Sequence, residues 1–137
     1  MPGIVPAIPL ALDLKPGSRL VDHFPEDAAA KPRHHNWGSV ETLSCSGGHR
    51  IERIVIKAGK ELPAHYHKRR SEHWTVVEGE AEAMLGDDVL IVSPDHSLYI
   101  PAGVVHGARA SNVAAVKMVA VHYGETVSDV DDMFAAV

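Results

Sequence analysis

Short runs of β-forming residues, separated by turn signals, make up most of the chain after Trp37. The runs lie at residues 40–44, 49–57, 72–78, 81–85, 89–92, 98–100 and 114–122. Turn-forming residues separate them, as in Ser46-Gly47-Gly48 and Gly86-Asp87-Asp88. No long helical period intervenes. Because strands at this close spacing pair antiparallel, they predict an all-β sandwich or barrel rather than a parallel α/β sheet.

The 137 residues fit one ordinary domain. Residues 1–36 mix proline, alanine and charged side chains without a sustained period, which predicts an irregular N-terminal arm or edge strand. We therefore expect the arm at 1–36 and the β-barrel domain at 37–137. The closing segment Ser128–Ala136 is predicted to form a short helix with Asp129 near its start.

The net charge of the chain limits the kinds of partner that it is expected to bind. A formal charge of −5 and a pI near 6.0 argue against nucleic acid or an anionic membrane, since both select a basic face. A small soluble substrate is expected instead.

Cys45 is the only cysteine, so no intrachain disulfide can form. The N-terminus lacks the basic region of an export signal, and no apolar run approaches the roughly 18 to 20 residues of a membrane span. We therefore expect a cytoplasmic protein.

The candidate chemistry lies between residues 59 and 72. On a strand, side chains at i and i+2 share a face, so His65 and His67 can present two imidazoles to one point. A turn that starts at Lys68 would return Glu72 beside them as a carboxylate ligand. Taken alone, a His-x-His pair also describes two polar residues that face solvent. By the same alternation His73 faces away from the ligands, and Trp74 shares their face, where it can wall a pocket.

Two motifs resemble those of the cupin superfamily. The first is a Gly, five residues, His-x-His, four residues, Glu, six residues and a Gly, and it matches Gly59, His65, His67, Glu72 and Gly79. The centre of the second matches Pro101, Gly103 and His106, with Asp95 at its leading Gly position and Ala110 at its trailing Asn position. The resemblance implies a single-domain cupin, a jelly-roll barrel of antiparallel strands. It also implies one divalent metal ion on His65, His67, Glu72 and His106.

A narrower resemblance covers residues 37–132. Its segments are Asn36–Ser39, Arg53–Lys60, Arg70–Trp74, Leu98–His106 and Val121–Glu125. Together they resemble the type II mannose-6-phosphate isomerase family, whose barrel is often the C-terminal domain of a bifunctional enzyme that also makes GDP-mannose. The resemblance implies the isomerase activity alone, interconverting mannose 6-phosphate and fructose 6-phosphate. The metal would act as a Lewis acid on the sugar oxygens.

The family usually has Gln where this chain has His65, and further histidines where it has Lys68 and Arg69. A set of three His and one Glu is also what Mn- or Fe-dependent cupin oxidases and decarboxylases use. Three function classes therefore stand: the sugar-phosphate isomerase, a dioxygenase or decarboxylase acting on a small organic acid, and a non-catalytic sugar-binding module. Zn is preferred through the resemblance, with Mn, Fe, Co or Ni as alternatives.

A phosphorylated substrate needs cations, and Lys68, Arg69 and Arg70 follow the ligands directly. Arg70 is the first choice, Lys68 the second, and Trp74 a further substrate contact. Weaker candidates for the phosphate are Arg53, Lys57 and Arg109. The sequence identifies no catalytic base, since Glu61, Glu78 and Glu80 have no established orientation. The remaining candidates for a structural or surface role are His34, His35, His49, His96 and His122. Cupins commonly pair through edge strands, so we expect a homodimer.

Overall fold

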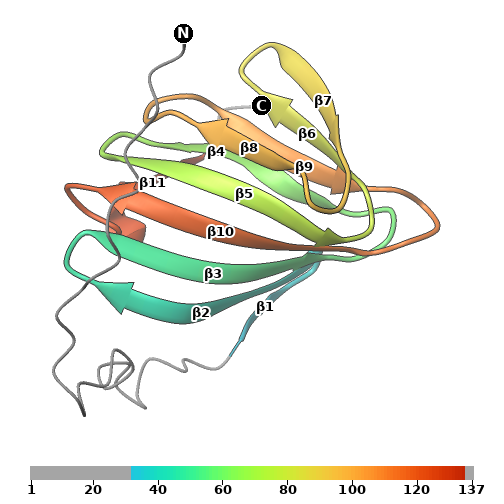
Figure 1. Ribbon diagram of the computed structural model, residues 1–137, viewed down its shortest axis with the longest axis horizontal. Coiled ribbons are helices and arrows are strands. Elements are labelled where there is room, and N and C mark those ends of the chain that lie inside the picture. The colour runs from blue at the N-terminus through green and yellow to red at the C-terminus, as the bar shows by residue number, and fades with distance from the viewer. Residues whose placement is uncertain (1–31, 135–137) are drawn as a thin grey trace, which may run out of the picture.

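Two antiparallel sheets face each other in this computed structural model, which describes residues 32–134 (Figure 1). One sheet has the strand order β1 (Arg33–His35), β2 (Gly38–Ser46), β3 (His49–Ile56), β10 (Val116–Gly124), β5 (Arg70–Glu78) and β8 (Ser97–Ile100). The other has the order β11 (Asp132–Phe134), β4 (Glu61–His67), β9 (His106–Ala110), β6 (Ala81–Leu85) and β7 (Asp88–Val92). The all-β prediction is confirmed.

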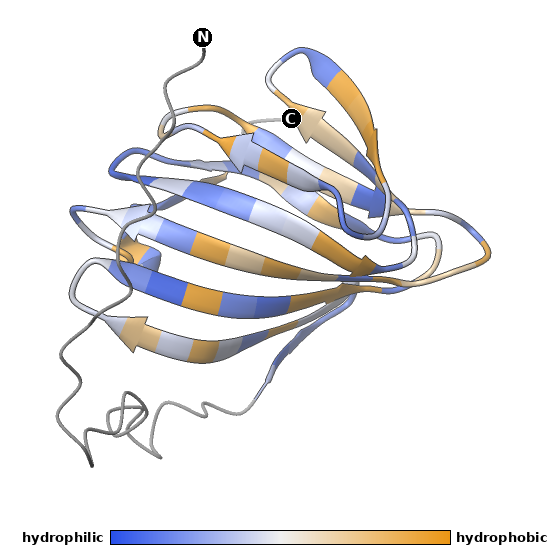
Figure 2. Cartoon of the chain, viewed as in Figure 1, coloured by the Kyte–Doolittle hydropathy of each residue, from blue (hydrophilic) through white to orange (hydrophobic). Residues whose placement is uncertain are grey.

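Alternating side chains build the core between the sheets. Along β10, Val116, Met118 and Ala120 are fully buried, whereas the residues between them are partly exposed. The same alternation colours the strands of Figure 2 in apolar and polar bands. Trp74 and Ile56 belong to the same core, and burying a large apolar side chain contributes roughly 1.5–3 kcal/mol. This packing fixes the inward face of each strand and so decides which polar residues point inward beside it.

The turn before β8 departs from the second cupin motif in sequence, but its backbone takes the left-handed conformation that a glycine would favour. Asp95 stands at the leading Gly position and has a φ of 69°, the left-handed region that glycine favours. Aspartate is among the few other residues that adopt this conformation, because its short side chain can bond locally. The substitution therefore leaves the turn intact, and Gly103 in the same motif has a φ of 84°.

The predicted C-terminal helix is wrong beyond its first turn. Ser128 caps a single 3₁₀ turn, η2 (Asp129–Asp131), by accepting a hydrogen bond from the backbone N–H of Val130. The chain then extends as β11, which pairs with β4 and places Asp132 opposite His67. Strand pairing thus replaces the helix, since the open edge of β4 offers backbone partners. Residues 135 and 136 lie outside the described range.

The predicted arm contains β1, which pairs antiparallel with β2 at the edge of the larger sheet. The rest of the arm, residues 1–31, lies outside the described residues. The edge strands of the two described sheets are β1, β8, β11 and β7. The homodimer, in which two chains would pair through such an edge, stays a prediction.

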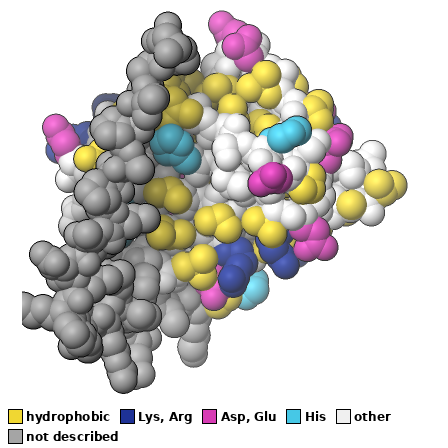
Figure 3. Space-filling view, viewed as in Figure 1, with side chains coloured by type: hydrophobic (Ala, Val, Ile, Leu, Met, Phe, Trp, Pro, Cys, Tyr) yellow, Lys and Arg dark blue, Asp and Glu magenta, His cyan; other side chains and the backbone are white. Residues whose placement is uncertain are grey.

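Within residues 32–134 no helix has the length and apolarity to cross a bilayer. Acidic and basic side chains are interspersed on the described part of the face in Figure 3.

Candidate metal centre

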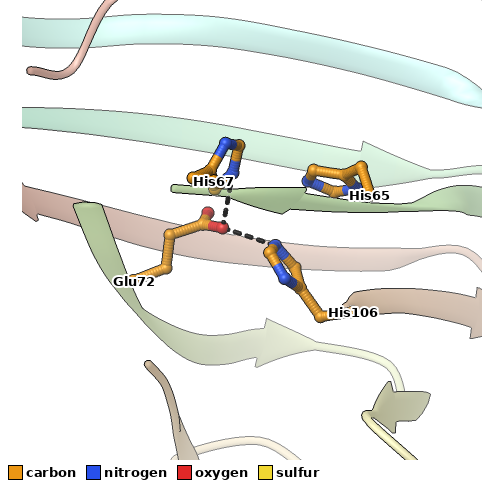
Figure 4. A group of neighbouring side chains, drawn as sticks. All are labelled: His65, His67, Glu72 and His106. Carbon is orange, nitrogen blue, oxygen red and sulfur yellow. Dashed lines mark hydrogen bonds and ion pairs between the residues drawn. The ribbon is translucent and has the colours of Figure 1, made fainter. Parts of the chain in front are cut away.

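Three histidines and one glutamate converge between the two sheets. His65 and His67 lie on β4, and His106 begins the neighbouring β9, where it pairs directly with His65. Glu72 reaches them from β5 in the opposite sheet, as Figure 4 shows. One candidate ligand atom from each of the four side chains lies within 4.8 Å of the others. The structure therefore brings together the set that the sequence predicted.

Backbone carbonyls orient two of the imidazoles. Nδ1 of His65 lies 2.7 Å from the carbonyl oxygen of Pro63, and Nδ1 of His106 lies 2.9 Å from that of Val104. A carbonyl only accepts, so each Nδ1 carries the proton and each Nε2 keeps a free lone pair. This tautomer is the one that a metal-binding imidazole requires.

The carboxylate of Glu72 divides its two oxygens between different neighbours. Oε2 lies 3.0 Å from Nε2 of His67 and 2.6 Å from Nε2 of His106. Oε1 accepts a hydrogen bond from the indole N–H of Trp74 at 3.2 Å and lies 3.1 Å from Nε2 of His122. The carboxylate is thus held from behind, which leaves Oε2 directed at the cluster as a single ligand atom.

The buried site shifts the pKa values of its members in different directions. Burial, together with the nearby His106, lowers the pKa of His65 to about 4. Burial also opposes charge on His67, but the close carboxylates of Asp132 and Glu72 outweigh it and raise the pKa to about 9. Burial likewise acts against ionised Glu72, yet the neighbouring imidazoles of His106, His67 and His122 hold the pKa of that carboxyl well below its usual range. A proton on His67 would stabilise these four side chains in the absence of a metal ion, and a bound cation would replace it.

The donor set fits a divalent metal ion. His67, Glu72 and His106 are at most 4% exposed, and Nδ1 of His67 and Nε2 of His106 are buried atoms without a hydrogen bond of good geometry. Imidazole and carboxylate together suit first-row divalent ions such as Zn, Mn, Fe, Co and Ni. Asp132 Oδ1 lies 3.0 Å from Nδ1 of His67, the carboxylate–histidine arrangement that supports metal ligands. Three His and one Glu are typical of cupin metal sites.

A cavity of about 300 Å³ opens onto the cluster. Its polar lining combines three arginines with three carboxylates, and the members are Arg33, Arg50, Arg70, Glu52, Glu72 and Asp132. His65 and His67 form part of the wall, and Trp37 and Phe134 contribute apolar surface. The cavity is therefore balanced in charge, with its cations already facing anions.

Two cavity residues, Glu52 and His122, were not predicted as site residues. The guanidinium of Arg70 donates from Nε to Nδ1 of His122 at 2.9 Å, so the His122 proton lies on Nε2. Nε2 in turn donates to Oε1 of Glu52 at 2.7 Å. Glu52 is 4% exposed, and although burial acts against its charge, His122 and Arg50 lower its pKa. The signal was present in β3 and β10, where both residues follow the parity of buried neighbours.

The predicted substrate residues occupy three different environments. Lys68 and Arg69 are exposed on the turn between β4 and β5. Arg70 lines the cavity but is 2% exposed, with Nη1 bonded to the carbonyl of Ser128 and Nη2 to Asp132. Trp74 is buried behind Glu72, so its position supports a ligand rather than a substrate.

The weaker candidates point away from the cavity. Arg53 is exposed and pairs with Glu41, and Lys57 and Arg109 are exposed as well. Arg53 and Lys57 face outward because the inward positions of β3 are Arg50, Glu52, Ile54 and Ile56. The three candidate bases of the sequence, Glu61, Glu78 and Glu80, are all exposed.

Comparison with known proteins identifies the family. The protein-family model described as mannose-6-phosphate isomerase C-terminal matches residues 25–135, which is most of the chain. The chain belongs to this family. As a mannose-6-phosphate isomerase C-terminal domain, it has the cupin fold that its motifs predicted.

Curated relatives are much longer proteins. The chain is 33% identical over 95 residues to the xanthan biosynthesis protein XanB of Xanthomonas campestris, covering 69% of this chain and 20% of that protein. It is 25% identical over 118 residues to mannose-1-phosphate guanylyltransferase of Escherichia coli, covering 82% of this chain and 25% of that one. The chain thus spans about a fifth to a quarter of the length of these relatives.

Solved structures support the fold alone. A Klebsiella pneumoniae protein with a double-stranded β-helix domain superposes with a TM-score of 0.68 at 21% identity, covering 83% of this chain and 96% of that one. Oxalate decarboxylase of Bacillus subtilis superposes with a TM-score of 0.69 at 18% identity, covering 75% and 29%.

Proposed function

We propose that this protein is a metal-dependent sugar-phosphate isomerase that interconverts mannose 6-phosphate and fructose 6-phosphate. The observation that carries the proposal is the cluster of three His and one Glu, three of whose members line a cavity, in a chain of the mannose-6-phosphate isomerase C-terminal family. The cavity of about 300 Å³ has the size of a small-ligand site.

The metal ligands in this proposal are His65, His67, Glu72 and His106. A divalent ion held there, preferably Zn, would supply a Lewis acid for the carbonyl and hydroxyl oxygens of the sugar. The chain contributes the surroundings. Burial of three of the four ligands keeps bulk water from the site, and the bonds behind His106 and Glu72 fix the direction of their ligand atoms.

An aldose–ketose isomerase must also move a proton between two neighbouring carbons, and His122 with Glu52 is our candidate pair. Both residues line the cavity, and the His122 Nε2–H lies between Oε1 of Glu52 and Oε1 of Glu72. The pair can hold a proton beside the cluster without giving up a metal ligand. Substituting Glu52→Gln keeps the volume and removes the acceptor charge, so it should lower kcat.

The test is turnover of mannose 6-phosphate with and without a chelator, with fructose 6-phosphate read directly. We expect chelator-sensitive conversion that is lost in Glu72→Gln, because the amide cannot act as an anionic ligand. His73→Gln is the matched control, since His73 is the next residue and faces outward. Stoichiometric metal without conversion in the unmodified protein would refute the isomerase.

A second candidate is oxygen-dependent chemistry on a small organic acid, with Mn or Fe as the metal. The position of His65 favours it, because this residue completes a set of three imidazoles and one carboxylate. Oxygen uptake by the Mn- or Fe-loaded protein distinguishes it from the isomerase. Binding of sugar phosphate without conversion or oxygen uptake would indicate a non-catalytic module.

A further inference from the structure

Two arginines at the rim of the cavity share one exposed carboxylate. Oδ2 of Asp129 lies 3.0 Å from Nη1 of Arg33, and Oδ1 lies 2.8 Å from Nη2 of Arg50. Each carboxylate oxygen therefore faces a different guanidinium. We call Arg33 and Arg50 the arginine clamp.

The clamp is fixed from its inner side by a second carboxylate. Oε2 of Glu52 accepts hydrogen bonds from Nε and Nη2 of Arg50 at 3.0 and 2.7 Å, and from Nη2 of Arg33 at 3.0 Å. The Glu52 side chain is 6% exposed, whereas that of Asp129 is 57% exposed. Glu52 is thus the permanent partner of the clamp, and Asp129 is an occupant that can turn into solvent.

Both arginines of the clamp line the cavity that opens onto the metal cluster, whereas Asp129 lies in a neighbouring pocket that Arg50 also lines. From the clamp, contacts run through Glu52 to His122 and from His122 to Glu72. Two side chains therefore separate the clamp from a metal ligand.

On the basis of the proposed function, we propose that the arginine clamp binds the phosphate group of the substrate, which displaces Asp129. A phosphate monoester brings more charge and more acceptor oxygens than a carboxylate, and guanidinium groups match its geometry. Releasing Asp129 costs less than releasing a buried partner would, because the Asp129 side chain is itself exposed to water. The displaced carboxylate regains its hydration.

Arg70 is less suited to this role, although the sequence favoured it. Its Nε, Nη1 and Nη2 are already bonded to His122, the Ser128 carbonyl and Asp132, and the residue is 2% exposed. A phosphate would have to displace buried partners there. At the clamp it needs to displace only one exposed side chain.

The test is calorimetric titration of the full-length chain with inorganic phosphate. Asp129→Ala should bind phosphate about tenfold more tightly than the unmodified protein, since one charge-assisted hydrogen-bonding competitor is removed. The gain should disappear in Asp129→Ala combined with Arg33→Gln. Arg53→Gln is the matched control, because Arg53 is an exposed arginine that faces away from the cavity.

The proposal is overturned if Asp129→Ala, or the isosteric Asp129→Asn, folds normally and binds phosphate no more tightly. It is also overturned if Arg33→Gln leaves phosphate affinity unchanged. Mannose and mannose 6-phosphate then serve as a matched pair of ligands. Arg33→Gln should weaken the binding of mannose 6-phosphate only. Binding of mannose 6-phosphate that depends on the clamp but leads to no turnover would refute the isomerase proposal and support the clamp. Turnover that is unchanged by Arg33→Gln would support the isomerase proposal and refute the clamp.

Discussion

At the scale of single residues, the contact between Asp132 and His67 should set metal affinity. Asp132 Oδ1 lies 3.0 Å from Nδ1 of His67 and therefore supports the ligand from behind. Asp132→Asn should weaken metal binding about tenfold, the lower end of what loss of such a support costs. Competition with a chromophoric chelator measures the affinity. Glu61→Gln removes an exposed charge from the same strand and should have no effect, and equal affinities in the two variants would contradict the prediction.

Metal uptake should depend on pH through the same histidine. The pKa of His67 is raised to about 9, so at neutral pH the metal-free protein carries a proton on the Nε2 that must bind the ion. Affinity should therefore rise about tenfold per pH unit from pH 7 to about 9 and then level off. Calorimetry in buffers of different ionisation enthalpy should find about one proton released per ion at pH 7. A metal affinity that does not change between pH 7 and 9 would contradict the raised pKa of His67.

The stability of the metal-free protein should follow the opposite trend. A pKa raised from 6.5 to about 9 means that protonated His67 stabilises the fold fully below pH 6.5, and that this contribution is lost as pH rises through about 9. Urea unfolding of chelated protein should show the loss, and Asp132→Asn should reduce it because one of the two carboxylate partners is removed. A free energy of unfolding that rises over this range would contradict the account.

At the scale of elements, η2 anchors the turn that carries Lys68 and Arg69. The buried carboxylate of Asp131 accepts the backbone N–H groups of both residues, at 3.0 and 2.9 Å. Asp131→Ala should cost about 2 kcal/mol, because two donors lose their partner. Asp129→Ala, two residues earlier in the same turn and with an exposed side chain, should cost less than about 1 kcal/mol. Urea unfolding compares the two, and equal losses would refute the anchoring role.

The turn between β5 and β6 should tolerate no side chain at Gly79. Its φ is 80°, and an added Cβ would lie 2.2 Å from the carbonyl oxygen of Ala115. Gly103 has a similar φ of 84° but no heavy atom within 4 Å of the same position. Gly103→Ala should therefore lower the free energy of unfolding only by the cost of a positive φ at alanine, about 1–2 kcal/mol. Gly79→Ala adds the clash and should lower it by roughly 3 kcal/mol or more. Similar losses of unfolding free energy would contradict the clash.

The sequence predicted most strands but not all of them. Alternation and turn residues located β3, β5 and β6 closely, since these strands carry clear apolar faces. It did not predict β9, where the run from His106 to Ala110 consists of small or polar residues, or β11, whose strand pairing depends on β4. Such strands are stabilised by partners distant in sequence, which local patterns cannot show.

At the scale of the whole molecule, the metal ligands could be predicted and the surrounding network could not. His65, His67 and Glu72 lie close together in sequence, so their spacing alone indicated a site. His122 meets Glu52 because β10 pairs with β3, and it meets Glu72 because β10 also pairs with β5. The inward face of β3 was ambiguous because it has charged residues on both faces.

The two sheets together create the site, because neither sheet contains the whole ligand set. The five-stranded sheet supplies the histidines and the six-stranded sheet supplies Glu72. The most direct test is therefore metal stoichiometry by elemental analysis after equilibration with Zn and extensive dialysis. We predict one ion per chain, lost in Glu72→Gln and His106→Gln while both variants remain folded, and retained in the exposed control His49→Gln. Absence of metal in the unmodified protein, or full retention in both ligand variants, would contradict the metal centre.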